Sequence, residues 1–105
     1  MAEILLVDAA GMSISMLSTR MDKYAKDNGL DYDVLGMADA ETDEHIKHTT
    51  PALIMIAPQV KYMYAKYAEK YGATIPVVNI NMMDYGIMNA KNVMQAALDA
   101  IEAGI

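Results

Sequence analysis

The residues best placed for chemistry lie in the segment 4–15, which reads I-L-L-V-D-A-A-G-M-S-I-S. An apolar run ends at Asp8, and a loop of small residues follows this carboxylate directly. At the start of a helix the backbone N–H groups have no intrahelical partner, and the helix dipole adds partial positive charge. Loops of this kind bind phosphate in α/β proteins, so the segment predicts phosphoryl chemistry or anion binding.

From the residues alone, two interpretations of this loop stay open: the first is a phosphate-binding loop, and the second is an ordinary turn between a strand and a helix. Gly11 permits a tight turn or a positive φ, and Ser13 and Ser15 can cap the helix or donate to phosphate oxygens. The spacing by itself favours the second interpretation, an ordinary strand-to-helix turn with a serine cap, because short turns of Gly and Ser are common.

Several better-defined phosphate motifs are missing from the sequence. There is no G-x-x-x-x-G-K-[ST], and no G-x-G-x-x-G follows the first apolar run. A thiol phosphatase needs a cysteine at the lip of the loop and an arginine six residues later, where the chain has Asp8 and Ile14. A two-component receiver needs an aspartate after its third strand, where Ala57, Pro58 and Gln59 stand. The sequence therefore argues against these four classes.

The elements that must position the loop follow from the apolar periodicity. The predicted strands are 4–7, 32–37, 52–57 and 75–80, and the predicted helices are 13–28, 39–48, 60–71 and 90–103, with 82–86 as a loop. This alternation predicts one α/β domain over residues 1–105, with an open four-stranded parallel sheet and helices on both faces. Pro76 favours an edge position for the last strand. Ligands bind beyond the carboxyl ends of such strands, where Asp8, Gln59 and Asp84 fall.

Composition limits the possible partners. The net charge of −6 argues against nucleic acid and anionic membrane surfaces, and the absence of cysteine excludes disulfides and thiolate metal sites. Neither a metal nor another cofactor is predicted, and His45 and His48 are interpreted as part of a solvated helix face. The eleven methionines are expected mostly to fill the core, while Met12 and Met16 beside the loop suit a surface that meets partners.

Three motifs together resemble a known family. They are V-D-A-A-G-M-S-I-S at 7–15, P-Q-V at 58–60 and M-D-Y-G at 83–86, and the chain resembles the lactose/cellobiose-type B components of the bacterial sugar phosphotransferase system. The likeness spans essentially the whole chain. It implies a phosphoryl relay in which a phosphohistidine of the A component donates to a cysteine of the B component, which then donates to a sugar in the membrane C component. It also implies a cytoplasmic protein that meets the membrane through the C component.

The family loop reads C-[SA]-[AG]-G-M-S-[TS]-S, so Asp8 occupies the position of the phosphorylated cysteine. By the same resemblance, the loop residues that would cradle the phosphate are Ala9, Ala10, Gly11, Met12, Ser13, Ile14 and Ser15. Ile14 replaces a threonine or serine and removes one hydroxyl. Secondary candidates are Gln59, which can bond the loop or only order its turn, and Asp84 with Tyr85, which can line the rim or form a polar loop.

Three interpretations of Asp8 remain. It can accept the phosphoryl group as an acyl phosphate, act as a fixed anion that occupies part of the site, or be an introduced mimic of phosphocysteine. A carboxylate is charged at neutral pH, and amides of the loop favour that form. We expect the second or third interpretation, with family membership intact and phosphoryl transfer impaired.

Two other functions compete with the relay. One is a regulatory module that binds the same partners without transferring a phosphoryl group. The other is a flavodoxin-like domain that binds a different phosphorylated ligand, which the length of the loop and the missing Phe and Trp disfavour. The sugar is not encoded in these residues, because the membrane component selects it.

Overall fold

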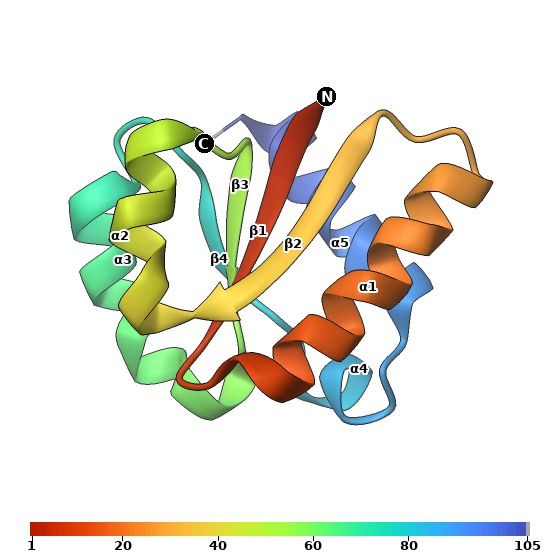
Figure 1. Cartoon of the computed structure of the whole chain (residues 1–105), viewed down its shortest axis with the longest axis horizontal. Coiled ribbons are helices and arrows are strands. Elements are labelled where there is room, and N and C mark those ends of the chain that lie inside the picture. The colour runs from red at the N-terminus through yellow and green to blue at the C-terminus, as the bar shows by residue number, and fades with distance from the viewer. Residues whose placement is uncertain (105) are drawn as a thin grey trace.

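Four parallel strands form the central sheet (Figure 1). The computed structural model describes residues 1–104, and residue 105 of the predicted domain lies outside the described residues. The strands are β1 (Ala2–Asp8), β2 (Tyr32–Ala38), β3 (Leu53–Ile56) and β4 (Val77–Asn79), and their order across the sheet is β2-β1-β3-β4. The predicted open, four-stranded parallel sheet is thus confirmed, with β4 at an edge.

Helices cover both faces of the sheet. Helices α1 (Gly11–Asp27) and α5 (Ala90–Ala103) pack together on one face, while α2 (Asp39–His48) and α3 (Tyr64–Tyr71) lie on the other (Figure 1). Two short elements follow the carboxyl ends of β3 and β4, the 3₁₀ helix η1 (Pro58–Met63) and α4 (Met82–Gly86). The lower edge of the molecule in Figure 1 is therefore built from strand ends and helix starts.

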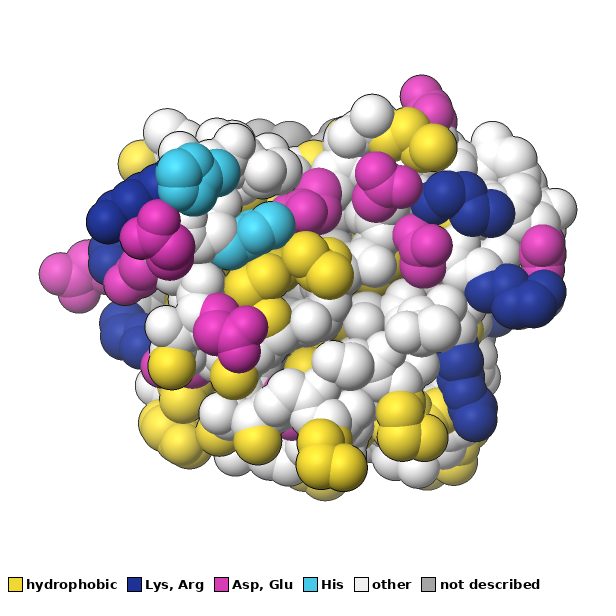
Figure 2. Space-filling model, viewed as in Figure 1, with side chains coloured by type: hydrophobic (Ala, Val, Ile, Leu, Met, Phe, Trp, Pro, Cys, Tyr) yellow, Lys and Arg dark blue, Asp and Glu magenta, His cyan; other side chains and the backbone are white. Residues whose placement is uncertain are grey.

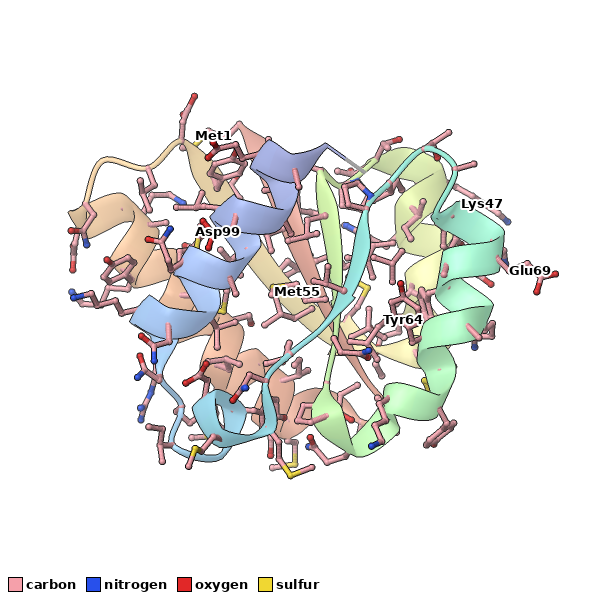
Figure 3. All side chains as sticks on the ribbon, turned by 180° about the vertical axis from the view of Figure 1, so that it is seen from behind. Met1, Lys47, Met55, Tyr64, Glu69 and Asp99 are labelled. Atoms are coloured by element: carbon pink, nitrogen blue, oxygen red, sulfur yellow. The ribbon has the colours of Figure 1, made fainter. Side chains whose placement is uncertain are left out.

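The core lies between the sheet and its two helical layers. Ile4, Leu5, Leu6 and Val7 on β1 are fully buried, and Met55 of β3 lies near the middle of the sheet in Figure 3. Each such buried apolar side chain contributes about 1.5–3 kcal/mol relative to an exposed one. This packing fixes β1, and with it the position of the residue that ends it.

Helix α1 approaches β2 very closely. A Cβ atom added at Gly36 of β2 would lie 2.8 Å from the Ile14 carbonyl oxygen and 2.8 Å from the Ser18 hydroxyl. Glycine at this position therefore allows the start of α1 to lie against the sheet. The outer edge of β2 is also covered, because Asp22 accepts a hydrogen bond from the Val34 amide at 2.9 Å.

Helices α2 and α3 are joined by charged and phenolic groups, which we call the α2–α3 clasp: Asp39, Asp43, Lys66, Tyr67, Lys70 and Tyr71. Lys66 Nζ lies 2.9 Å from an Asp39 carboxylate oxygen, and Lys70 Nζ lies 2.7 Å from Asp43. Tyr67 donates to Asp39 and Tyr71 donates to Asp43. The same arrangement thus repeats after four residues on both helices.

The clasp also fixes tyrosine hydroxyls of α3. Tyr67 is buried, and its hydroxyl bonds Asp39 and lies 2.7 Å from the Thr42 hydroxyl. Tyr64, by contrast, is 38% exposed and lines a surface groove beside β4. The buried hydroxyl has polar partners because α2 brings carboxylates over the face of α3.

Every predicted strand differs from the observed one by one or two residues at an end, and three helical elements also differ from the sequence prediction. Helix α1 begins at Gly11, two residues before the predicted start, and this first turn, with Met12 and Ser13, is exposed. The predicted helix 60–71 is observed as two elements, the 3₁₀ helix η1 up to Met63 and the α-helix α3 from Tyr64, and Val60 within η1 has a non-helical φ of −122° and ψ of 31°. The predicted loop 82–86 is a short helix, which the Asn81 side chain caps by accepting from the Asp84 amide.

The two histidines behave differently. His48 is exposed, as expected of a solvated helix face. His45 instead bonds the Glu3 carboxylate of β1 at 2.8 Å, and both side chains are largely buried. The interpretation of His45 as solvated was wrong because α2 lies across the start of the central strand.

Candidate functional site

Asp8 ends the central strand β1 and is only 7% exposed. The strand order reverses at β1, because β2 continues the sheet on one side and β3 on the other. In open parallel sheets, the crevice beyond the strand ends at such a reversal is the usual place for a ligand. The carboxylate therefore occupies the position that topology favours for binding.

Three hydrogen-bond donors surround the Asp8 carboxylate. The Ala9 amide donates to Oδ1 at 2.7 Å, while Gln59 Nε2 and the Tyr85 hydroxyl donate to Oδ2 at 3.3 Å and 3.2 Å. These donors come from the loop after β1, from η1 and from α4. Segments far apart in the sequence thus converge on one oxyanion.

The Tyr85 hydroxyl is held in its protonated form. Burial, together with the charge of Asp8 and the hydrogen bond to it, raises the pKa of Tyr85 above the usual value for a phenol. The side chains of Gln59 and Ser13 act in the opposite direction, without reversing the shift. Tyr85 is therefore a hydrogen-bond donor to Asp8 throughout the neutral pH range.

Among residues 1–104, no Lys, Arg or His side chain forms an ion pair within 4.0 Å of the Asp8 carboxylate. The positive ends of backbone dipoles are nearby instead, since α1 begins at Gly11 and α2 begins directly after Ala38, the β2 partner of Asp8. The site holds its anion with neutral groups and dipoles.

The start of α1 leaves backbone donors free. Its N-cap is Ala10, which has no side-chain acceptor, and no other side chain in residues 1–104 bonds the amides of Gly11, Met12 or Ser13. By contrast, the asparagine side chains at 81 and 89 cap α4 and α5. The first amides of α1 thus have donor capacity for an anion.

The predicted loop residues have different surroundings. Ser13 and Ser15 lie within α1 and are exposed, so neither is the N-cap that the sequence suggested. Ile14 is fully buried in the core, so only its backbone can face a ligand. Ala9 is the member of the loop that contacts the Asp8 carboxylate.

Asp84 does not contact Asp8. Its carboxylate accepts from Asn92 Nδ2 at 3.1 Å, and its carbonyl oxygen accepts from the Asn89 amide at 2.9 Å. These bonds join α4 to the start of α5 and so support the helix that carries Tyr85. The rim position suggested for Asp84 stays a prediction, and the observed contacts of Asp84 position the neighbouring tyrosine.

Sequence reasoning did not find that Gln59 and Tyr85 share one carboxylate oxygen. Gln59 follows β3, which pairs directly with β1, so the strand order would have indicated its proximity. Tyr85 follows β4, and it reaches Asp8 because α4 turns the chain back toward β1. Residues 82–86 were predicted as an irregular loop, and a loop prediction does not indicate the direction in which the chain continues.

An exposed apolar rim surrounds this edge. Its members share high exposure, from 56% to 84%, and are Met12, Met16, Tyr62, Met82, Met83 and Ile87. Figure 2 shows hydrophobic side chains gathered along the same lower edge. Met21, Met37, Met55 and Met94 fill the core as expected. Flexible methionines on a surface can adapt to different partners.

Neither a metal cluster nor a membrane span is visible in the described part of the chain. Residues 1–104 contain no group of three or more His, Asp or Glu side chains that would hold a metal ion. None of the helices described is both long and apolar enough to cross a bilayer.

Comparison with known proteins gives one family. The model for "PTS system, Lactose/Cellobiose specific IIB subunit" matches residues 3–96. A cellobiose-specific EIIB component of Lactococcus lactis subsp. lactis is 39% identical over 98 residues, which cover 90% of this chain and 91% of the relative. A galactose-specific EIIB component of Lactococcus lactis subsp. cremoris is 38% identical over the same shares of both chains.

Solved structures agree with this result. The solution structure of a cellobiose-specific IIB component from Borrelia burgdorferi has a TM-score of 0.75 at 34% identity, covering 97% of this chain and 93% of that one. A lactose-specific IIB domain from Streptococcus pneumoniae also has a TM-score of 0.75, covering 94% of this chain and 96% of that one, and at 22% identity it supports the fold alone.

Proposed function

The chain belongs to the lactose/cellobiose-specific IIB subunit family of the phosphotransferase system, and we propose that Asp8 holds the place of the phosphoryl group in its relay site. In this proposal the chain meets a phosphohistidine-bearing A component and a membrane C component with its sugar. Asp8 stands where the family carries its cysteine, so the chain resembles the phosphorylated carrier and transfers poorly.

The observation that carries the proposal is the set of donors around Asp8. One backbone amide, one carboxamide and one phenol converge on a carboxylate that is 7% exposed. A cysteine thiolate has one acceptor atom, whereas a phosphoryl group carries several acceptor oxygens. A site with several converging donors fits an oxyanion at this position better than it fits a lone sulfur atom.

Phosphoryl acceptance by Asp8 is disfavoured by the same contacts. A carboxylate is a much weaker nucleophile than a thiolate, and hydrogen bonds from three donors reduce its reactivity further. Its negative charge also repels an incoming phosphate. Free amides at Gly11 to Ser13 can still attract an anion, so binding of a donor and transfer from it are separate questions.

A second candidate, a regulatory module that binds the partners without transfer, rests on the rim. The exposed side chains of the apolar rim remain available for contact with a partner, whether or not Asp8 accepts a phosphoryl group. Such a chain would compete with a working B component for the A component. The two candidates differ in what Asp8→Cys does.

The experiment compares the unaltered chain with Asp8→Cys, each incubated with phosphorylated A component and examined by intact-mass spectrometry. We expect no stoichiometric adduct on the unaltered chain and one phosphoryl group on the Asp8→Cys variant. A hydroxylamine-labile adduct on Asp8 that moves to sugar would overturn the proposal. An Asp8→Cys chain that binds the A component but stays unphosphorylated would instead support the regulatory module.

A further inference from the structure

The cations of this acidic chain are divided into two groups by their partners. Five lysine side chains, at 23, 26, 47, 66 and 70, each have a carboxylate within 4.0 Å. Among residues 1–104, Arg20, Lys61 and Lys91 have none. The sequence carries 14 acidic residues, so carboxylate partners are plentiful. These three side chains therefore lack a carboxylate because of where they lie on the fold.

Each of the three unpaired cations lies within four residues of an exposed member of the apolar rim. Lys61 lies in η1 beside the exposed Tyr62, and Lys91 lies in the first turn of α5, which follows the exposed Ile87. Arg20 is one turn beyond Met16 on the same face of α1. With a helical rise of about 1.5 Å per residue, Arg20 lies about 13 Å along the helix from Gly11. We call Arg20, Lys61 and Lys91 the cationic triad.

Two of these positions bear further marks of a binding surface. Arg20 and Met16 line one open depression on α1, with a volume of about 340 Å³, together with Ser15 and Thr19. Lys91 lies at the positive end of the α5 dipole, where a cation is unfavourable for the helix. Helix stability therefore does not explain the lysine at this position.

We propose that the cationic triad binds carboxylates on the protein that donates the phosphoryl group, around an apolar centre supplied by the rim. This inference rests on the proposed function and adds the chemistry of the partner: an apolar patch bordered by acidic side chains. The triad offsets the repulsion between a donor that carries a phosphoryl group and a chain of net charge −6. Charges at the border of an interface mainly accelerate encounter and fix orientation.

The test compares two triple variants with the same net charge. Arg20→Gln, Lys61→Gln and Lys91→Gln remove the triad. The matched control, Lys23→Gln, Lys47→Gln and Lys70→Gln, removes three paired cations, of which Lys47 lies well away from the carboxyl edge in Figure 3. Affinity for the A component of its own phosphotransferase system is measured by calorimetry and stopped-flow at low and high salt, and thermal melting checks the fold of each variant.

We expect the triad variant to lose about 5- to 30-fold in affinity at low salt, mostly in the association rate, and the control to lose less than twofold. The loss should shrink at high salt. Equal affinities of the two variants would overturn the inference, as would binding of the unaltered chain to anionic phosphatidylglycerol vesicles through the triad with donor affinity unchanged. If the A component binds neither the unaltered chain nor the control, the proposed function itself fails, and that result is distinct.

Discussion

Asp8 and the α2–α3 clasp are two ways of holding aspartate in the same small domain. Asp8 is buried at a strand end and contacts an amide, a carboxamide and a phenol, and it has no cationic partner in the part of the chain that the structure describes. Asp39 and Asp43 also contact phenols, but each has a lysine partner. The clasp neutralises its charges within the fold, whereas the site keeps an uncompensated anion.

This difference separates charges that are balanced within the fold from a charge that is left without a cationic partner among the described residues. A lysine and a phenol around a carboxylate stabilise a single negative charge at a fixed position. A site with only neutral donors and dipoles can accommodate anions of different charge, such as a carboxylate with one negative charge or a phosphate monoester with nearly two. Four substitutions or conditions test this contrast, from the largest expected effect to the smallest.

Removing the buried phenol of the clasp should cost the most. Tyr67→Phe leaves the Asp39 carboxylate without its phenolic donor and should lower the free energy of unfolding by about 2 kcal/mol, as for other hydrogen bonds to charged groups. Denaturant unfolding measures the change. Tyr62→Phe, at a side chain that is 74% exposed, is the control and should have no effect.

Matched neutral substitutions should separate the two regions directly. Asp39→Asn loses the attraction of Lys66 and should lose about 1–2 kcal/mol of stability. Asp8→Asn loses no cationic partner and relieves the cost of burying a charge, so its stability should change by less than about 1 kcal/mol. A larger loss at Asp8 than at Asp39 would contradict the contrast.

Acid should weaken the clasp. Burial by itself would raise the pKa of Asp39, but Tyr67 and Lys66 reverse this and lower it, while Lys70 and Tyr71 lower the pKa of Asp43. Because the folded values lie below the unfolded value of about 3.9, this stabilisation is fully present above that pH and is lost as pH falls through the folded pKa. Unfolding followed from about pH 6 to pH 3 should show a shallower loss in Asp39→Asn than in Asp31→Asn, an exposed control.

The smallest effect is expected at the exposed end of the clasp. Lys70 and Asp43 are 53% and 59% exposed, and exposed ion pairs contribute about 0–1 kcal/mol. Lys70→Gln should therefore leave the denaturant midpoint of unfolding nearly unchanged, and salt should remove any difference. A change as large as that of Tyr67→Phe would mean that charge, rather than the buried phenol, dominates the clasp.

The sequence was informative where the physical cause was local. The apolar run 4–7 and the helical repeats predicted the sheet, the layers and the position of Asp8, because the spacing of apolar residues along the chain reflects which side chains are buried. The contacts of Asp8 with Gln59 and Tyr85 span 51 and 77 residues. Strand order was needed to place Gln59, and the short helix α4 was needed to place Tyr85.

The clasp and the bond between His45 and Glu3 escaped prediction for a similar reason. Both sets of contacts depend on which polar side chains of α2 lie against a neighbouring element. The sequence periodicity of α2 predicts only the position of its weakly apolar face. The resemblance of the loop to the family's cysteine loop predicted which residues would form the site. The contacts around the carboxylate supply the reason why an aspartate is accommodated there.

The central claim is that the carboxylate of Asp8 imitates a phosphoryl group in the relay site. The most direct measurement compares backbone amide NMR shifts of residues 9–15 in three samples: the unaltered chain, Asp8→Cys, and Asp8→Cys after phosphorylation by the A component. We predict that the unaltered chain matches the phosphorylated sample more closely than the unphosphorylated one. Amide shifts that coincide with those of unphosphorylated Asp8→Cys would contradict the claim.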